Sequence, residues 1–113
     1  MIKIVAFIRK NPQLTQEEFV NYWKSVHVPL VKQRLPGLIK YTGSFPVGVK
    51  SAPEAIVADF DALVELGFDS VESMQKAMSS PTFMSEDRQI SSAKLMNLSR
   101  TESLVMEEIT VPL

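Results

Sequence analysis

The chain has 113 residues, 45% of them hydrophobic and 22% charged, with 12 basic and 13 acidic side chains and a net charge of -1. This composition is typical of a folded protein and excludes an intrinsically disordered chain. The balanced charge gives no reason to expect nucleic acid or a membrane as a partner. Because cysteine is absent, disulfides and thiolate chemistry are excluded.

We expect one domain that covers residues 1–113, since this length suits a single hydrophobic core. The apolar start of the chain is too short to span a bilayer, and it has no cleavage site of the signal-peptide kind. The expected location is therefore the cytoplasm.

The first predicted element is a strand at residues 2–9, rich in β-branched and aromatic residues and bounded by Asn11-Pro12. Both of its faces are apolar at the centre, with Ile4, Ala6 and Ile8 on one and Val5 and Phe7 on the other. A sheet with one solvated face would alternate more cleanly. The strand is therefore either a central strand with modest burial on one side, or its second face is covered by another subunit.

A helix is predicted over residues 16–34. Thr15 and Glu18 form a capping box at its start, and the Leu35-Pro36-Gly37 segment opposes its continuation. At about 100° per residue, its apolar side chains form one stripe, which we expect to be buried. The stripe contains Phe19, Trp23, Val26 and Leu30.

His27 is the only histidine, and it lies roughly 50° to the side of this stripe. Pro29 lacks an N–H and crowds the carbonyl of Ser25, so a kink or weak turn is expected beside His27. An unperturbed imidazole titrates at about pH 6.5, so His27 at the edge of a cleft could act as a general acid or base. The alternative is a structural histidine that bonds to the freed Ser25 carbonyl.

The rest of the chain is predicted to form a strand, a long loop, a strand, two helices and a final strand. These elements are a strand at 38–45, a loop at 46–57, a strand at 58–68, a helix capped by Asp69, a helix from Pro81 to about residue 96, and a strand at 98–111. The resulting order, βαββα(α)β, is that of a ferredoxin-like α+β domain. In such a domain a four-stranded antiparallel sheet carries helices on one face.

Acidic side chains alternate along the strand at 58–68 and place Asp59, Asp61 and Glu65 on one face. Leu66 and Phe68 lie on the other face, toward the helices. Because His27 also lies on the helix side, the acids and the histidine do not converge, and no metal site is predicted. Glu65 is expected to pair with a basic group at a dimer interface.

Several segments occur together in a fixed order over nearly the whole chain. They are Met1-Ile2-Lys3, Phe19-x2-Tyr22-Trp23-x3-His27-x-Pro29-Leu30, Leu35-Pro36-Gly37-x3-Tyr41, Glu65-Leu66-Gly67-Phe68-Asp69-Ser70 and Glu107-Glu108. Because of these segments and their order, the chain resembles the EthD family of the dimeric α+β barrel superfamily. The resemblance implies a homodimer in which two ferredoxin-like subunits pack their open sheet faces together.

Similar proteins in that superfamily include cofactor-free polyketide cyclases and monooxygenases, muconolactone isomerases and haem-binding enzymes. The sequence departs from the family pattern at Gly67, where many members carry a bulky aromatic residue, and at Ala62, where glycine is common. Gly67 would leave room on the open sheet face or mark a bulge. The third strand carries no cysteine, so an isomerase mechanism that needs a thiol does not carry over.

With this resemblance, the sequence predicts an enzyme that acts without metal or organic cofactor on a small hydrophobic oxygenated compound. The reaction would be an isomerisation, cyclisation, dehydration or oxidation. His27 would shuttle a proton, and Tyr41 would stabilise charge on a substrate oxygen. The residues expected to bind the substrate are Trp23, Arg34, Leu66 and Phe68.

Each of these assignments has a structural alternative. Tyr41 could be a half-buried strand tyrosine with its hydroxyl at the surface, Trp23 a core residue, and Arg34 an exposed side chain near a helix end. For the whole protein, the alternatives are a non-catalytic dimer that binds a small apolar ligand or assists a degradative pathway, and haem binding through His27.

Overall fold

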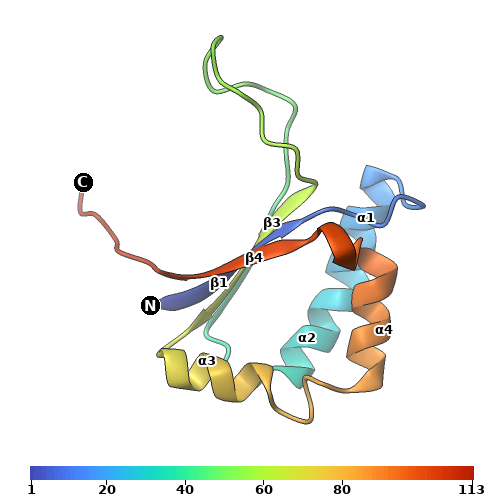
Figure 1. The fold of residues 1–113 in the computed structure, drawn as a ribbon, viewed down its shortest axis with the longest axis vertical. Helices are drawn as coiled ribbons and strands as arrows, with labels where there is room; N and C mark the ends of the chain where they lie inside the picture. Colours follow the sequence, from blue (N-terminus) through green and yellow to red (C-terminus); the bar gives the residue numbers. More distant parts are fainter.

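The computed structural model describes residues 1–113 and contains a four-stranded antiparallel sheet in the order β2-β3-β1-β4. The strands are β1 (Ile2–Ile8), β2 (Lys40–Ser44), β3 (Ala62–Phe68) and β4 (Glu102–Glu107). The helices are α1 (Gln16–Tyr22), α2 (Val28–Arg34), α3 (Val71–Met78) and α4 (Glu86–Leu95). All four helices lie on the same side of the sheet (Figure 1). The predicted ferredoxin-like α+β fold is confirmed.

The chain is helical from residue 16 to residue 34, as predicted, but Trp23–His27 forms a π-helical turn between α1 and α2. The N–H of Val28 donates to the carbonyl of Trp23, which lies one residue further back than in an α-helix. Pro29 has no N–H and cannot bond to the Ser25 carbonyl. The predicted irregularity beside His27 is therefore present, as an extra residue in the turn directly before Pro29.

This extra residue changes which side chains face the sheet. Phe19, His27 and Val31 are buried, with exposed fractions of 0%, 6% and 3%. Val26, by contrast, is 45% exposed. The prediction that Val26 belongs to the buried stripe is wrong, because the π-helical turn shifts the helical phase after residue 23. The same shift moves His27 from the edge of the stripe into it.

All four predicted strands are longer than the strands of the structure, and the difference is largest for β3 and β4. β3 begins at Ala62 rather than residue 58, since β1 ends at Ile8 and only the N–H of Asp61 still bonds to its carbonyl. β4 begins at Glu102 rather than residue 98, because Leu98–Arg100 forms a 3-10 helical turn. It ends at Glu107 rather than residue 111, since its neighbour β1 begins at Ile2, and the last bond runs from the Glu108 N–H to the Met1 carbonyl.

Two predicted helix starts are also wrong. Ser70, not Asp69, caps α3, and its hydroxyl accepts the N–H of Ser73. α4 begins after Ser85 rather than at Pro81, because the Ser80 hydroxyl bonds to nearby backbone groups and holds residues 81–84 in turns. Such local side-chain bonds compete with a regular helix.

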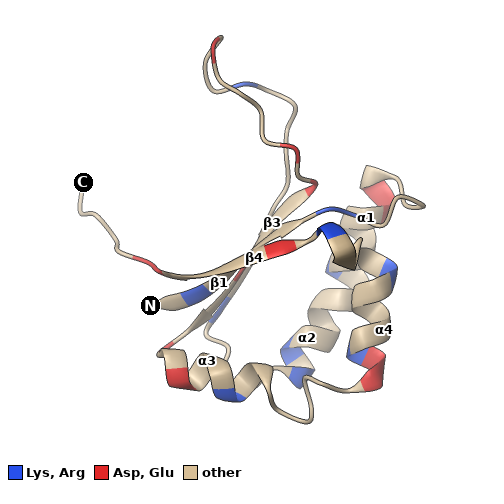
Figure 2. Ribbon diagram, in the orientation of Figure 1, with Lys and Arg blue, Asp and Glu red and all other residues tan.

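The connection between β2 and β3 covers residues 45–61, longer than the predicted loop at 46–57, and projects away from the sheet (Figure 1). The segment after Glu108 also extends away from the body and carries no charged side chain (Figure 2). None of the helices combines the length and the apolar character that crossing a bilayer would require.

Gly67 does not mark a bulge, because the strand register through it is continuous on both sides. A Cβ there would lie 2.8 Å from Sδ of Met1 and 2.9 Å from Cβ of Lys40. The room expected beside Gly67 is therefore filled by two side chains.

Gly43 of β2 has a packing role. A Cβ at this position would lie 2.5 Å from Cη2 of Trp23. The indole also packs edge-on against the rings of Tyr41 and Phe45, with centroid distances of 5.6 and 5.4 Å. Glycine is therefore needed where the tryptophan approaches the sheet, and Trp23 has a core role in addition to any other.

Replacement of Gly43 by alanine is expected to lower the free energy of unfolding by about 1–3 kcal/mol, because overpacking outweighs the modest gain in strand propensity. Since Trp23 is the only tryptophan, its fluorescence spectrum should shift at the same time. Urea unfolding followed by tryptophan emission measures both effects. Ser44→Ala, one residue along the strand at an exposed position, is the control and should change neither. A Gly43→Ala protein indistinguishable from the original would contradict this packing.

Candidate functional site

A cavity of about 400 Å³ lies between the helical layer and the sheet. Fourteen of its 19 lining residues are hydrophobic. The floor comes from side chains of the central strands, among them Ile4, Ala6, Val64 and Leu66. Its size and apolar character are those of small-molecule sites, which range from about 300 to 1,000 Å³.

Four of the six sequence-predicted site residues line this cavity. They are His27, Tyr41, Trp23 and Leu66. Phe68 does not line it, because its side chain is fully buried in the core with Val31 and Met74. Arg34 does not line it either, because its guanidinium pairs with Asp87 at 2.6 Å in a partly exposed ion pair. His27 and Tyr41, the two residues predicted as catalytic, thus line one cavity, whereas Arg34 and Phe68, two of the predicted binding residues, lie elsewhere.

The His27 ring is held by α4. Its Nδ1 lies 2.9 Å from Oγ of Ser91, and the same Oγ lies 3.3 Å from the Tyr22 hydroxyl. His27 makes this bond rather than one to the Ser25 carbonyl, so the structural alternative considered from the sequence has a different partner. With Nδ1 occupied, Nε2 is the ring nitrogen that a ligand can reach. The serine hydroxyl can accept from a protonated Nδ1 or donate to an unprotonated one, so Nε2 accepts in the first tautomer and donates in the second.

Burial, and to a smaller extent the nearby positive charge of Arg88, lower the pKa of His27 to about 4. The imidazole is therefore neutral at pH 7. A neutral ring can offer one hydrogen bond to a ligand at Nε2, but it is a weaker base than an unperturbed histidine.

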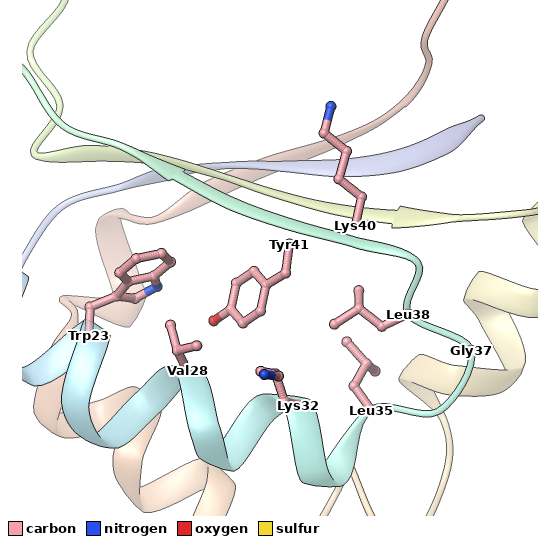
Figure 3. Close-up of a pocket in the computed structure, with 8 residues that line it drawn as sticks. All are labelled: Trp23, Val28, Lys32, Leu35, Gly37, Leu38, Lys40 and Tyr41. Atoms are coloured by element: carbon pink, nitrogen blue, oxygen red, sulfur yellow. The ribbon is translucent and has the colours of Figure 1, made fainter.

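Tyr41 extends from β2 toward the helices. Burial raises the pKa of its phenol above the ordinary range, while the Trp23 indole opposes this shift. The phenol therefore stays protonated and can donate a hydrogen bond. Its hydroxyl points toward α2, near Val28 (Figure 3).

Tyr41 and Trp23 also line a second hollow of about 460 Å³, which opens to the surface between α2 and β2. These two aromatic side chains are common to both hollows. Lys32 lies at the rim of the surface hollow, whereas Lys40 extends to the opposite side of the sheet (Figure 3). The phenol thus lies between an inner apolar cavity and an outer hollow with one nearby cation.

Three polar residues of α4 were missed in the sequence. Ser91 holds His27, Ser92 lines the cavity, and Arg88 lines it as the only charged residue. Their spacing, Arg88-x2-Ser91-Ser92-x2-Leu95, places small polar side chains on the same helix face as a buried leucine. Polar residues on a helix face that also carries a buried leucine are the pattern by which these three residues could have been predicted from the sequence.

The acids of the third strand do not reach the cavity. Asp59 pairs with Arg9, Asp61 accepts the backbone N–H of Lys10, and Glu65 pairs with Lys3 on the open face of the sheet. The basic partner expected for Glu65 therefore lies in the same chain. No group of three or more histidine or acidic side chains is placed to hold a metal ion.

The depressed pKa of His27 predicts a specific dependence of stability on pH. Between about pH 6.5 and about pH 4, the unfolded chain binds a proton at His27 that the folded protein does not. This contribution to stability is fully present above about pH 6.5 and is lost as the pH falls to about 4, by up to roughly 3 kcal/mol.

Urea unfolding of the protein and of His27→Gln from pH 4 to 7.5 would measure this loss. The difference between the two curves isolates His27, because both proteins share every carboxylate. The original protein should lose stability faster than the variant as the pH falls. A constant offset between the curves would contradict a neutral, buried imidazole.

The EthD domain model matches residues 11–91. Among solved structures, the chain is similar to an EthD family protein from Bacillus halodurans C-125, with 23% identity over 96% of this chain and 99% of that one (TM-score 0.67). It is also similar to a dimeric ferredoxin-like protein of unknown function from Thermobifida fusca YX, with 17% identity over 93% and 88% (TM-score 0.58). A third similar structure is a monooxygenase from Streptomyces coelicolor in complex with nanaomycin D, with 17% identity over 99% and 89% (TM-score 0.60).

These identities are low, so the structural likeness shows the fold alone. No curated protein matches the sequence. The domain model, however, covers well over half of the chain. The chain therefore belongs to the EthD family.

Proposed function

We propose that this protein is a cofactor-independent enzyme that acts on a small hydrophobic oxygenated compound. The observation that carries the proposal is that His27 and Tyr41 line one apolar cavity of about 400 Å³. Trp23 and Leu66 are the proposed substrate contacts, because they line the same cavity. The reaction class is isomerisation, cyclisation, dehydration or oxidation.

The two polar groups have complementary roles in this proposal. The neutral imidazole of His27 takes a proton from the substrate at Nε2 and returns it at another atom. The Tyr41 phenol donates a hydrogen bond to the substrate oxygen on which negative charge develops. An apolar lining strengthens both interactions, because it lowers the local dielectric constant. The Ser91 contact positions His27 for this transfer.

The monooxygenase of similar fold is in complex with nanaomycin D. That complex supports an organic small molecule as the ligand class for this fold. We therefore propose lactones, phenols, quinones and polyketide-like molecules as substrates.

A second candidate function is a non-catalytic protein that binds the same class of ligand. The pKa of His27, lowered to about 4, favours this alternative, because a weak base transfers protons less readily near neutral pH. It predicts saturable binding without any change in the ligand.

We also propose that the protein is a homodimer that packs through the open face of its sheet. Leu104 and Met106 of β4 are 55% and 43% exposed. On the neighbouring strand β1, Phe7 is partly exposed on the same face, whereas Val5, which pairs with Leu104, is already buried. The similar protein from Thermobifida fusca is dimeric, which supports a second copy as the partner.

His27→Ala is expected to lower turnover about 100-fold or more if the histidine transfers the proton, and Tyr41→Phe should lower it through loss of the hydrogen bond. A panel of lactones, phenols, naphthoquinones and polyketide-like compounds, followed by mass spectrometry, would identify the substrate. Circular dichroism confirms that each variant folds. An unchanged rate in folded His27→Ala would contradict the acid/base role, and binding without product from any compound would favour the second candidate.

Leu104→Asp is expected to convert the dimer to a monomer, because a carboxylate at the centre of an apolar interface loses hydration without gaining a partner. Light scattering coupled to size exclusion measures the mass. Ile90→Asp is the matched control, since Ile90 is also an exposed aliphatic residue, 47% exposed, but lies on α4. A dimer that survives Leu104→Asp and dissociates with Ile90→Asp would place the interface on the helices instead.

A further inference from the structure

We propose that Arg88 makes the inner cavity selective for hydrophobic carboxylates, with the guanidinium binding the anionic group of the ligand. This inference deepens the proposed function, because it narrows the proposed small oxygenated compounds to those that carry a carboxylate, and it rests on the cavity being the ligand site. It concerns the class of ligand rather than the reaction.

The charge of the cavity is the first support. Arg88 is the only charged residue of the lining. It takes part in no ion pair, whereas Arg9 and Arg34 pair with Asp59 and Asp87. The acid next to Arg88 in the sequence is thus already bound to another arginine. The cavity therefore has one positive charge with no carboxylate in its lining to offset it.

The hydrogen bonds of Arg88 are the second support. A guanidinium has five N–H donors. Nε donates to the carbonyl of Phe83 at 2.7 Å, and Nη1 donates to Oγ of Ser92 at 3.2 Å. Three donors remain, and planar N–H pairs of this kind match the two oxygens of a carboxylate.

The rigidity of Arg88 is the third support. The guanidinium lies 4.1 Å from the centre of the Phe83 ring, and its Nε is bonded to the carbonyl of the same residue. A side chain held at two places loses less conformational entropy when it binds a ligand. Desolvation in the cavity also lowers the pKa of Arg88, and an anion would relieve this penalty.

An anion bound at Arg88 has a consequence for His27. Arg88 is the smaller cause of the lowered pKa of the imidazole, after burial, so neutralising its charge should reverse part of that shift and raise the pKa. Because the chain has a single histidine, its proton resonances report this change without ambiguity. The ligand would thereby increase the basicity of the group proposed to act on it.

The test compares two ligands of nearly equal shape, 2-naphthoate and 2-naphthamide, by isothermal titration calorimetry at pH 7. The original protein should bind the carboxylate at least about tenfold more tightly than the amide, since a hydrogen bond to a charged group exceeds a neutral one. Arg88→Gln should remove this preference and leave amide binding unchanged, and Arg88→Lys should retain part of it. Histidine NMR titrations should show a raised pKa of His27 with naphthoate and not with naphthamide.

Lys32→Gln is the matched control, because Lys32 is the cation at the rim of the neighbouring surface hollow, beside Tyr41 and Trp23. It should keep the carboxylate preference. Loss of the preference in Lys32→Gln but not in Arg88→Gln would overturn the proposal and move the anion to the outer hollow.

Equal binding of both ligands by the original protein would overturn the Arg88 inference alone. If neither ligand binds, the cavity is not a ligand site, and the proposed function fails with it. Should Arg88→Gln not fold, the proposal is tested by Arg88→Lys, which should prefer the carboxylate less strongly than the original protein does.

Discussion

The arrangement of the candidate site depends on one backbone feature, the π-helical turn at Trp23–His27. Pro29 cannot bond to the Ser25 carbonyl, so one helical hydrogen bond is already missing here. An extra residue therefore destabilises the helix less at this point than it would in an uninterrupted segment. The turn changes the helical phase, and His27 instead of Val26 faces the sheet. Without that shift the histidine would lie beside the cavity, and Ser91 would have no imidazole to hold.

Burial of His27 then determines the chemistry that the cavity can support. A neutral, buried ring bonded to Ser91 has a fixed position but a low basicity. Arg88 lowers that basicity further in the free protein, whereas a bound anion would offset its charge. Polar groups on α4 therefore do more than cover the sheet, because Ser91 holds the one histidine and Arg88 adds to the effect of burial on its proton affinity.

Much of the fold was predictable from local signals. The capping box at Thr15 and Glu18, the Pro-Gly segment after residue 34 and the strand at the start of the chain were all identified correctly. The start of β3 and the end of β4 were not, since a strand stops pairing where its neighbour stops, and that neighbour is distant in sequence. The start of α4 was also wrong, because the hydroxyl of Ser80 stabilises a turn where proline at the first helical position had suggested a helix.

The sequence by itself determined the order of elements, the ferredoxin-like class, the EthD resemblance and the importance of a single histidine next to a proline. These depend on local propensity, spacing and residue type, which are present in the chain before it folds. Only the tertiary structure decided that His27 is buried and neutral, that Arg34 pairs with Asp87 away from the cavity, and that Arg88 lies in the lining with no acidic partner. Burial and electrostatic environment are properties of all the elements that surround a side chain, so they arise when α4 packs against the first helix and the sheet.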